Sequence, residues 1–281
     1  MSNTANPHYH RRKLRRILRR AREARGLLQR DVAHRMDWSP SKVIRIESGA
    51  VKVSTNDLKA LLALYGIMDA ELIEDILATA KASRLPPWWN EFIDLVDTEF
   101  ARQLGYEASA AELFIVYNSV IPGLLQTRSY ATNILKTFQP GEDLSRRVDL
   151  RLRRQGLYDR QEPPKVNFIL GEAALHVEVG GPQVLRDQLL HLIEIIDSGK
   201  ANIEIIPFSE GSHPGLIGPF ELMAFDDGDG DVVAFETPVT FTILREEPGV
   251  VSAYRETFEA MRELTIKGDA ARQFIQDLIR G

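Results

Sequence analysis

The sequence predicts two domains, an all-α N-terminal domain of five short helices and a larger α+β C-terminal domain. The chain has 281 residues, which is more than one typical domain. Its charge divides sharply: residues 1–68 hold 15 Lys and Arg against 5 Asp and Glu, whereas residues 69–281 hold 20 against 35. The periodicity also changes, from short helices in the first part to helices mixed with short strands in the second. In the second part we expect helices over 89–105 and about 144–161 and a short strand over 240–244, among others.

Local signals define the helices of the first part. An amphipathic helix that ends at Gly26 is predicted by the spacing of Leu14, Ile17, Leu18 and Ala21. A second helix is expected over 29–36 and a third over 40–47, where Ser39 is an N-cap candidate and Pro40 suits the first helical position. A fourth helix, capped by Ser54 or Thr55, is expected to carry Leu58, Leu61, Leu62 and Leu64, and a fifth is expected over 69–83. The predicted domain boundaries are a disordered arm at 1–10, a helical domain at 11–83, a linker at 84–88 and an acidic domain at 89–281.

The second and third helices have the character of a DNA-reading helix-turn-helix. The second of two such short helices enters the major groove and presents small polar and basic side chains. Gln29, Ser39 and Lys42 are expected to meet backbone phosphates. Base edges are expected to meet Ser41 and Arg45, and Ile44 a thymine methyl group. The basic charge agrees with this prediction, although a solvated basic tail would show it too.

One further pair has two equally weighted interpretations. Arg22 and Glu47 are expected either to form a buried or half-buried ion pair that joins the first and third helices, or to leave Glu47 as an exposed cap.

Two stretches of sequence resemble known families. The segment 26–49, GLLQRDVAHRMDWSPSKVIRIESG, resembles the xenobiotic-response-element class of helix-turn-helix, also called Cro/C1-type. The C-terminal part carries a series of short motifs: VIPGLLQT at 120–127 with Tyr130, RLRRQ at 151–155, GEAAL at 171–175 with GG at 180–181, DQL at 187–189, IIP at 205–207 and GPF at 218–220. Through these motifs it resembles the WhiJ-like, antitoxin-like regulators. The resemblance implies a transcription regulator, encoded beside a small protein that binds it and modulates its DNA binding.

The acidic domain carries no pattern typical of an enzyme. Nucleophile elbows, Walker loops and dinucleotide fingerprints are absent from the sequence, so we predict no catalytic residue and no cofactor. Glu172 and His176 are spaced like two metal ligands on a helix, but too few further ligands follow, so no metal is predicted. Arg147, Arg151 and Arg154 recur at helical spacing. They form either a solvated, salt-bridged face or a docking surface for an acidic partner.

Together these features favour a homodimeric regulator that binds double-stranded DNA. We expect a repressor of developmental or adjacent genes, gated through the acidic domain by the co-encoded protein. A small-molecule sensor and an antitoxin-type protein that sequesters a partner are the alternatives. The chain has no cysteine and no apolar stretch long enough for a membrane span, and nothing near Met1 resembles a signal peptide, so a cytoplasmic, nucleoid-associated protein is expected.

Overall fold

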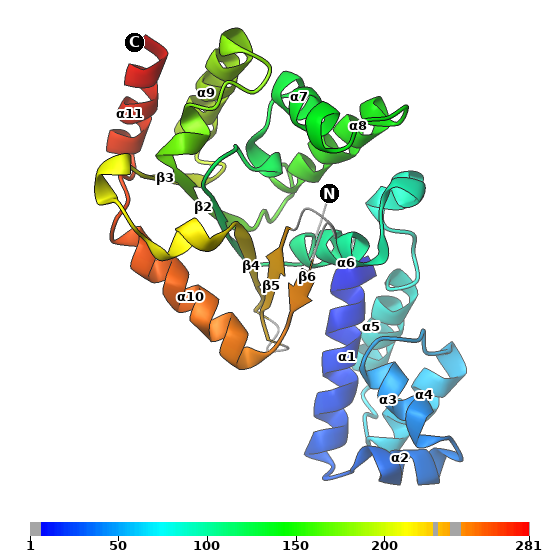
Figure 1. The fold of residues 1–281 in the computed structure, drawn as a ribbon. Coiled ribbons are helices and arrows are strands. Elements are labelled where there is room, and N and C mark those ends of the chain that lie inside the picture. The colour runs from blue at the N-terminus through cyan, green and yellow to red at the C-terminus, as the bar shows by residue number, and fades with distance from the viewer. Residues whose placement is uncertain (1–6, 227–229, 237–242, 281) are drawn as a thin grey trace. The chain divides into compact units, whose positions relative to one another are not determined.

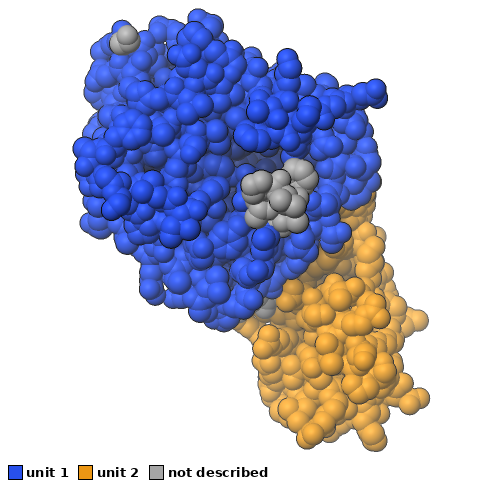
Figure 2. Space-filling model, in the orientation of Figure 1, with its two compact units in different colours: residues 1, 91–225, 230–281 blue, residues 2–90, 226–229 orange. Residues whose placement is uncertain are grey.

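The computed structural model describes residues 7–226, 230–236 and 243–280, and the chain divides into two compact units (Figures 1 and 2). The N-terminal unit takes in residues 2–90, and the C-terminal unit residues 91–225 and 230–281. The predicted fold class is confirmed, because helices alone build the first unit and a six-stranded sheet with helices builds the second. Within the described part of the chain, no helix combines the length and apolar character of a membrane span.

The N-terminal unit is a bundle around one apolar core. Its helices are α1 (Pro7–Ala24), α2 (Gln29–Met36), α3 (Pro40–Glu47), α4 (Thr55–Leu64) and α5 (Ala70–Ala82). One apolar stripe of each helix faces inward, and the core includes Leu18, Val32, Val43, Leu58, Leu61 and Ile76. Gly26, with φ of 65°, adopts the left-handed conformation just after α1, where glycine has no steric penalty.

The first helix starts earlier than expected. Residues 7–10, which we placed in a disordered arm, form the first turns of α1. Pro7 fits a helix start because the first turn needs no backbone N–H from it. Moreover, the side chains of His10 and Arg12 are buried, which ties this end of the helix down. Residues 1–6 of the expected arm lie outside the described residues.

A mixed sheet forms the centre of the C-terminal unit. In spatial order its strands are β3 (Asn202–Ile206), β2 (Lys165–Gly171), β1 (Glu112–Tyr117), β4 (Phe220–Ala224), β5 (Val232–Phe235) and β6 (Ile243–Arg245). The first three run parallel to one another, and the last three pair antiparallel. Residues 240–242 of the strand expected at 240–244 lie outside the described residues.

Helices cover both faces of the sheet (Figure 1). The core on one face takes residues from α6 (Thr98–Glu107), α7 (Arg128–Phe138), α9 (Pro182–Asp197) and α11 (Asp269–Arg280). The core on the other face takes residues from α10 (Pro248–Arg262). In addition, α8 (Leu144–Arg154) packs against α7.

Two helical stretches differ from the sequence prediction. The expected helix over 89–105 is a 3₁₀ helix (Trp88–Leu95) followed by α6, because Asp97 starts a new helix by accepting a hydrogen bond from the Phe100 backbone N–H at 2.8 Å. The helix expected over 144–161 ends as α8 at Arg154 and continues as a 3₁₀ turn (Gln155–Leu157) that contains Gly156.

Candidate nucleic-acid interface

A tight turn joins α2 and α3. Asp37 follows α2 with φ of 54°, in the left-handed conformation. Its backbone N–H donates to the carbonyl of His34, and the backbone N–H of Trp38 donates to the carbonyl of Ala33. Ser39 then caps α3 by accepting from the Lys42 backbone N–H at 3.2 Å, and Pro40 is the first helical residue. Both α2 and α3 have the bounds that the sequence predicts, because these local signals define their ends.

A buried ion pair holds α3 against α1. Arg22 Nε lies 2.7 Å from Glu47 Oε1, and both side chains are at most 10 % exposed. The second oxygen of Glu47 accepts from Gln29 Nε2 at 2.8 Å. The buried-pair interpretation of Arg22 and Glu47 is therefore confirmed. Gln29, which we expected at a phosphate, has one amide N–H engaged with Glu47 and lies at the start of α2, half-buried.

The side chain of Lys42 also has internal partners. Its Nζ lies 3.1 Å from Asp57 Oδ2 on α4, and it stands 3.7 Å from the centre of the Trp38 ring. Both contacts stabilise the charged ammonium group of Lys42 in this position. A phosphate contact by Lys42 therefore has to compete with Asp57, which the sequence prediction did not anticipate.

The outer face of α3 is open. Val43, Ile46 and Glu47 point into the bundle, and the predicted base-reading residues Ser41, Ile44 and Arg45 are exposed. Ile44 is 48 % exposed, which is unusual for an isoleucine and leaves an apolar contact available. Among the described residues no carboxylate forms an ion pair with Arg45. Its guanidinium therefore keeps its full hydrogen-bonding capacity for a base edge or a phosphate.

The three arginines of α8 that could form a docking surface have different surroundings. Arg154 is buried and forms an ion pair with Glu107 of α6, with its Nε 3.2 Å from Glu107 Oε2. Arg151 donates to Gln126 at 3.0 Å and Arg147 to Gln139 at 3.2 Å, and both are half-buried. Arg154 therefore follows the salt-bridged alternative and does not belong to a docking surface, because the face of α8 that carries it packs into the domain.

The spacing of Glu172 and His176 has a local explanation. His176 Nε2 lies 3.3 Å from Glu172 Oε1, and the other carboxylate oxygen accepts from the Phe208 backbone N–H at 2.6 Å. Both oxygens of Glu172 are thus engaged within the chain. In the residues that the structure describes, no three His, Asp or Glu side chains gather as a metal site would need.

Sequence reasoning missed the cations of α1 and of the loop after α3. Arg11, Arg15 and Lys52 line a pocket there, together with apolar residues of the core. Gly49, two residues after the end of α3, lies against the Arg15 side chain. Arg15 and Gly49 are 34 positions apart in the sequence. No local sequence pattern connects them, so this contact could not be predicted.

Two protein-family models match the chain. A helix-turn-helix domain model matches residues 13–74, which include α2 and α3 with their turn. A model described as a domain of unknown function (DUF5753) matches residues 100–277, which is more than half of the chain. No match was found among curated proteins or among solved structures. The protein is thus a DNA-binding helix-turn-helix protein of the kind found in transcription regulators, and it belongs to the DUF5753 family.

Proposed function

We propose that this protein is a sequence-specific repressor that reads double-stranded DNA through α3. The observation that carries the proposal is the outer face of α3, where Ser41, Ile44 and Arg45 are exposed and Arg45 has no carboxylate partner among the described residues. These side chains suit polar base edges, a methyl group and guanine respectively. Ser39, Gln29 and Lys42 flank this face, where backbone phosphates would lie.

The repressor acts as a homodimer in this proposal. A single helix-turn-helix contacts only a few base pairs, and dimers commonly read two half-sites about 34 to 36 Å apart. The C-terminal unit would receive the co-encoded small protein, with Arg147 and Arg151 of α8 as its contact residues. Binding of that protein would change the affinity for DNA by favouring one arrangement of the dimer.

The test is a gel-shift measurement with DNA from the protein's own promoter region, with and without the small protein encoded next to it. A shift that unlabelled promoter DNA competes away, but unrelated DNA does not, supports the proposed specificity. A change of that shift on adding the neighbour supports gating. Equal competition by both DNAs would instead make the N-terminal unit a non-specific binder held by phosphates.

A second candidate function, small-molecule sensing, is favoured by a polar cluster inside the C-terminal unit. Next to the buried pair of Arg154 and Glu107, Gln103 Nε2 donates to Glu221 Oε2 at 2.7 Å. Glu221 Oε1 and the Tyr158 hydroxyl are buried without a hydrogen-bond partner among the described residues. Burial raises the pKa of Glu221 well above its usual range. Buried groups with perturbed pKa values gather at functional sites.

A hollow of about 330 Å³ adjoins this cluster, and Tyr158 lines it with Leu124, Leu152, His191 and Ile195 among others. Thermal unfolding in the presence of fractionated cell metabolites tests the candidate. A fraction that raises the Tm of the wild type but not of the Tyr158→Phe and Glu221→Gln variants supports a sensor. If only the co-encoded protein raises the Tm, the sensing candidate fails and partner gating stands.

A further inference from the structure

The loop after α3, residues 48–54, returns to the helix that it leaves. The Val51 backbone N–H donates to the carbonyl of Arg45 at 3.2 Å, and the Ser48 hydroxyl donates to the same carbonyl at 3.2 Å. Arg45 is thus held through its backbone while its side chain stays exposed. Because α3 has only eight residues, its direction depends on tertiary contacts more than on its own hydrogen bonds. The loop is therefore one of the parts that set the direction of the DNA-reading helix.

A residue from the other end of the N-terminal unit holds this loop. Arg84, which follows α5, donates from Nη2 to the backbone carbonyl of Val53 at 2.5 Å, across 31 positions of sequence. A hydrogen bond with a charged donor is roughly twice as strong as one between neutral groups. The Val53 side chain is buried in the apolar core of the unit. Val53 is therefore held by its side chain and by its carbonyl together.

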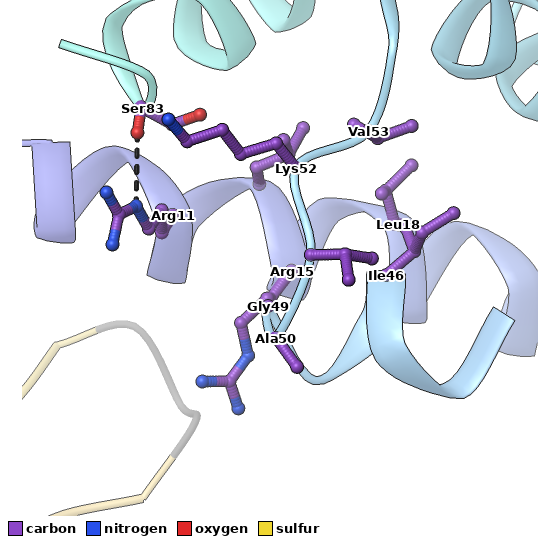
Figure 3. A pocket seen from close by; sticks show the side chains of 11 residues that line it. Arg11, Arg15, Leu18, Ile46, Gly49, Ala50, Lys52, Val53 and Ser83 are labelled. Atoms are coloured by element: carbon purple, nitrogen blue, oxygen red, sulfur yellow. Dashed lines mark hydrogen bonds between the residues drawn. The ribbon is translucent and has the colours of Figure 1, made fainter. Parts of the chain in front are cut away.

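The backbone next to Arg84 is itself fixed by α1. Arg11 Nε donates to the Ser83 carbonyl at 3.1 Å, and Figure 3 shows this bond, with Lys52 of the loop extending toward Ser83. Ser83 is buried, and its hydroxyl donates to the Ala80 carbonyl at 2.8 Å. The Arg84 side chain therefore starts from a backbone that cannot move freely, which a residue needs if it is to hold another segment in place.

Arg84 makes its contact with the loop and not with a carboxylate. It is half-buried, and no carboxylate of the described residues forms an ion pair with it. It also lies outside α2 and α3, which carry most of the predicted DNA contacts. An effect of Arg84 on DNA binding would therefore pass through the loop after α3.

We propose that Arg84 is a positioning residue for DNA recognition. By holding Val53 it fixes the loop, and the loop in turn fixes the end of α3 through Val51 and the Arg45 carbonyl. The inference rests on the proposed function, in which α3 reads the bases. Contacts with base edges carry the sequence information and need precise geometry, whereas phosphate contacts serve every sequence. Loss of Arg84 therefore lowers the discrimination between DNA sequences more than it lowers the affinity for DNA in general.

Discrimination between two DNAs tests this role. Fluorescence anisotropy gives the affinities of the full chain for DNA from its own promoter region and for unrelated DNA, at several salt concentrations. Arg84→Met is expected to bind the promoter DNA about three- to tenfold more weakly, since one charge-assisted hydrogen bond is lost, and to bind unrelated DNA like the wild type. Arg84→Lys keeps a charged donor and should recover part of the loss. The matched control is Arg20→Met, which removes the same charge from an exposed position of α1 and should keep the wild-type ratio of affinities.

Hydrogen exchange measures the loop without DNA. Mass spectrometry of peptides that cover residues 48–54 follows the Val51 amide, which should exchange about tenfold faster in Arg84→Met because the loop opens more often. Arg11→Met frees the Ser83 carbonyl instead, so it should change the exchange and the discrimination in the same direction. This second variant keeps the test informative if Arg84→Met fails to fold.

Two results would overturn the role of Arg84. Equal losses on promoter and unrelated DNA, with a salt slope reduced by about one, would assign Arg84 to a phosphate. Unchanged discrimination despite faster exchange of Val51 would mean that the loop does not set the direction of α3. The variant Arg45→Ala separates this failure from failure of the proposed function. If Arg45→Ala lowers discrimination and Arg84→Met does not, the role of Arg84 alone fails; if neither does, α3 does not read the bases and both proposals fail.

Discussion

The two units of this protein use their arginines in opposite ways. In the C-terminal unit most arginines pair with a carboxylate of the same unit, among them Arg102, Arg128, Arg146, Arg154, Arg255, Arg262 and Arg272. In the N-terminal unit Arg22 alone forms a buried pair among the described residues, and Arg45 and Arg15 have no carboxylate partner there. The acidic unit therefore neutralises most of its own arginines, whereas part of the positive charge of the basic unit stays available to an outside anion.

This difference explains why a count of basic residues is a poor guide to a binding surface. The arginines of α8 have helical spacing as regular as those of α1, yet each of the residues Arg146, Arg153 and Arg154 is paired with an Asp or Glu of the same unit. A basic helix in an acidic domain finds internal partners. A basic helix in a domain with few carboxylates does not, and only there does the charge predict an anion as the partner.

The strongest test of this comparison removes one member of a buried pair. Glu107→Ala leaves Arg154 buried without its partner, and we expect the free energy of unfolding to fall by about 3–5 kcal/mol. Urea denaturation followed by circular dichroism measures the change. The variant Glu107→Ala with Arg154→Met should recover much of the loss, because no uncompensated charge is then left inside. A loss below about 1 kcal/mol would mean that water reaches Arg154 in solution.

In the basic unit, truncation of an unpaired arginine should affect binding and leave stability unchanged. Arg45→Ala is expected to weaken binding to the preferred DNA site by about 1–3 kcal/mol and to relax discrimination at one base pair. Fluorescence anisotropy with a set of single-base variants of the site measures both effects. Arg128→Ala, which removes an exposed arginine of the acidic unit, is the control and should bind DNA normally. An equal loss on every sequence would instead assign Arg45 to a phosphate.

A smaller effect is expected where a side chain has both a structural and a proposed DNA-binding role. Ser39→Ala removes the oxygen that caps α3, and this should lower the free energy of unfolding by about 1 kcal/mol. Ser39→Asp keeps a cap but adds a negative charge, so it should restore stability and still weaken DNA binding. Chemical denaturation and anisotropy on the same two variants separate the roles. If Ser39→Asp binds DNA like the wild type, Ser39 is a cap and no more.

Local signals explain which parts of this structure could be predicted. The bounds of α2 and α3 follow from Ser39, Pro40 and neighbouring residues, all within one turn of the positions that they define. The open face of α3 follows from the same pattern, because Val43 and Ile46 have to point inward. The Arg22–Glu47 pair spans 25 residues and could be stated only as one of two possibilities.

The features that could not be predicted from the sequence are contacts between segments that lie far apart in the chain. Arg154 and Glu107 are 47 residues apart, and helical spacing does not say which face of α8 packs inward. Lys42 meets Asp57, which belongs to a helix whose position depends on the packing of the whole bundle. Likewise, the pocket beside Arg15 needs α1 and the loop after α3 to be placed together. Each of these features depends on tertiary packing, which one sequence does not specify.

The smallest effect is expected for the exposed pairs of the acidic unit. Arg128 Nη1 lies 2.8 Å from Asp149 Oδ1, but the two side chains are 62 % and 46 % exposed. Asp149→Asn should therefore lower the free energy of unfolding by only about 0.2–1 kcal/mol, since solvent screens the pair, and less at high salt. Urea denaturation at low and high salt measures both quantities. A salt-independent loss of several kcal/mol would contradict this expectation and would mean that exposed pairs also carry the stability of this unit, which we assign to buried pairs such as Arg154 with Glu107.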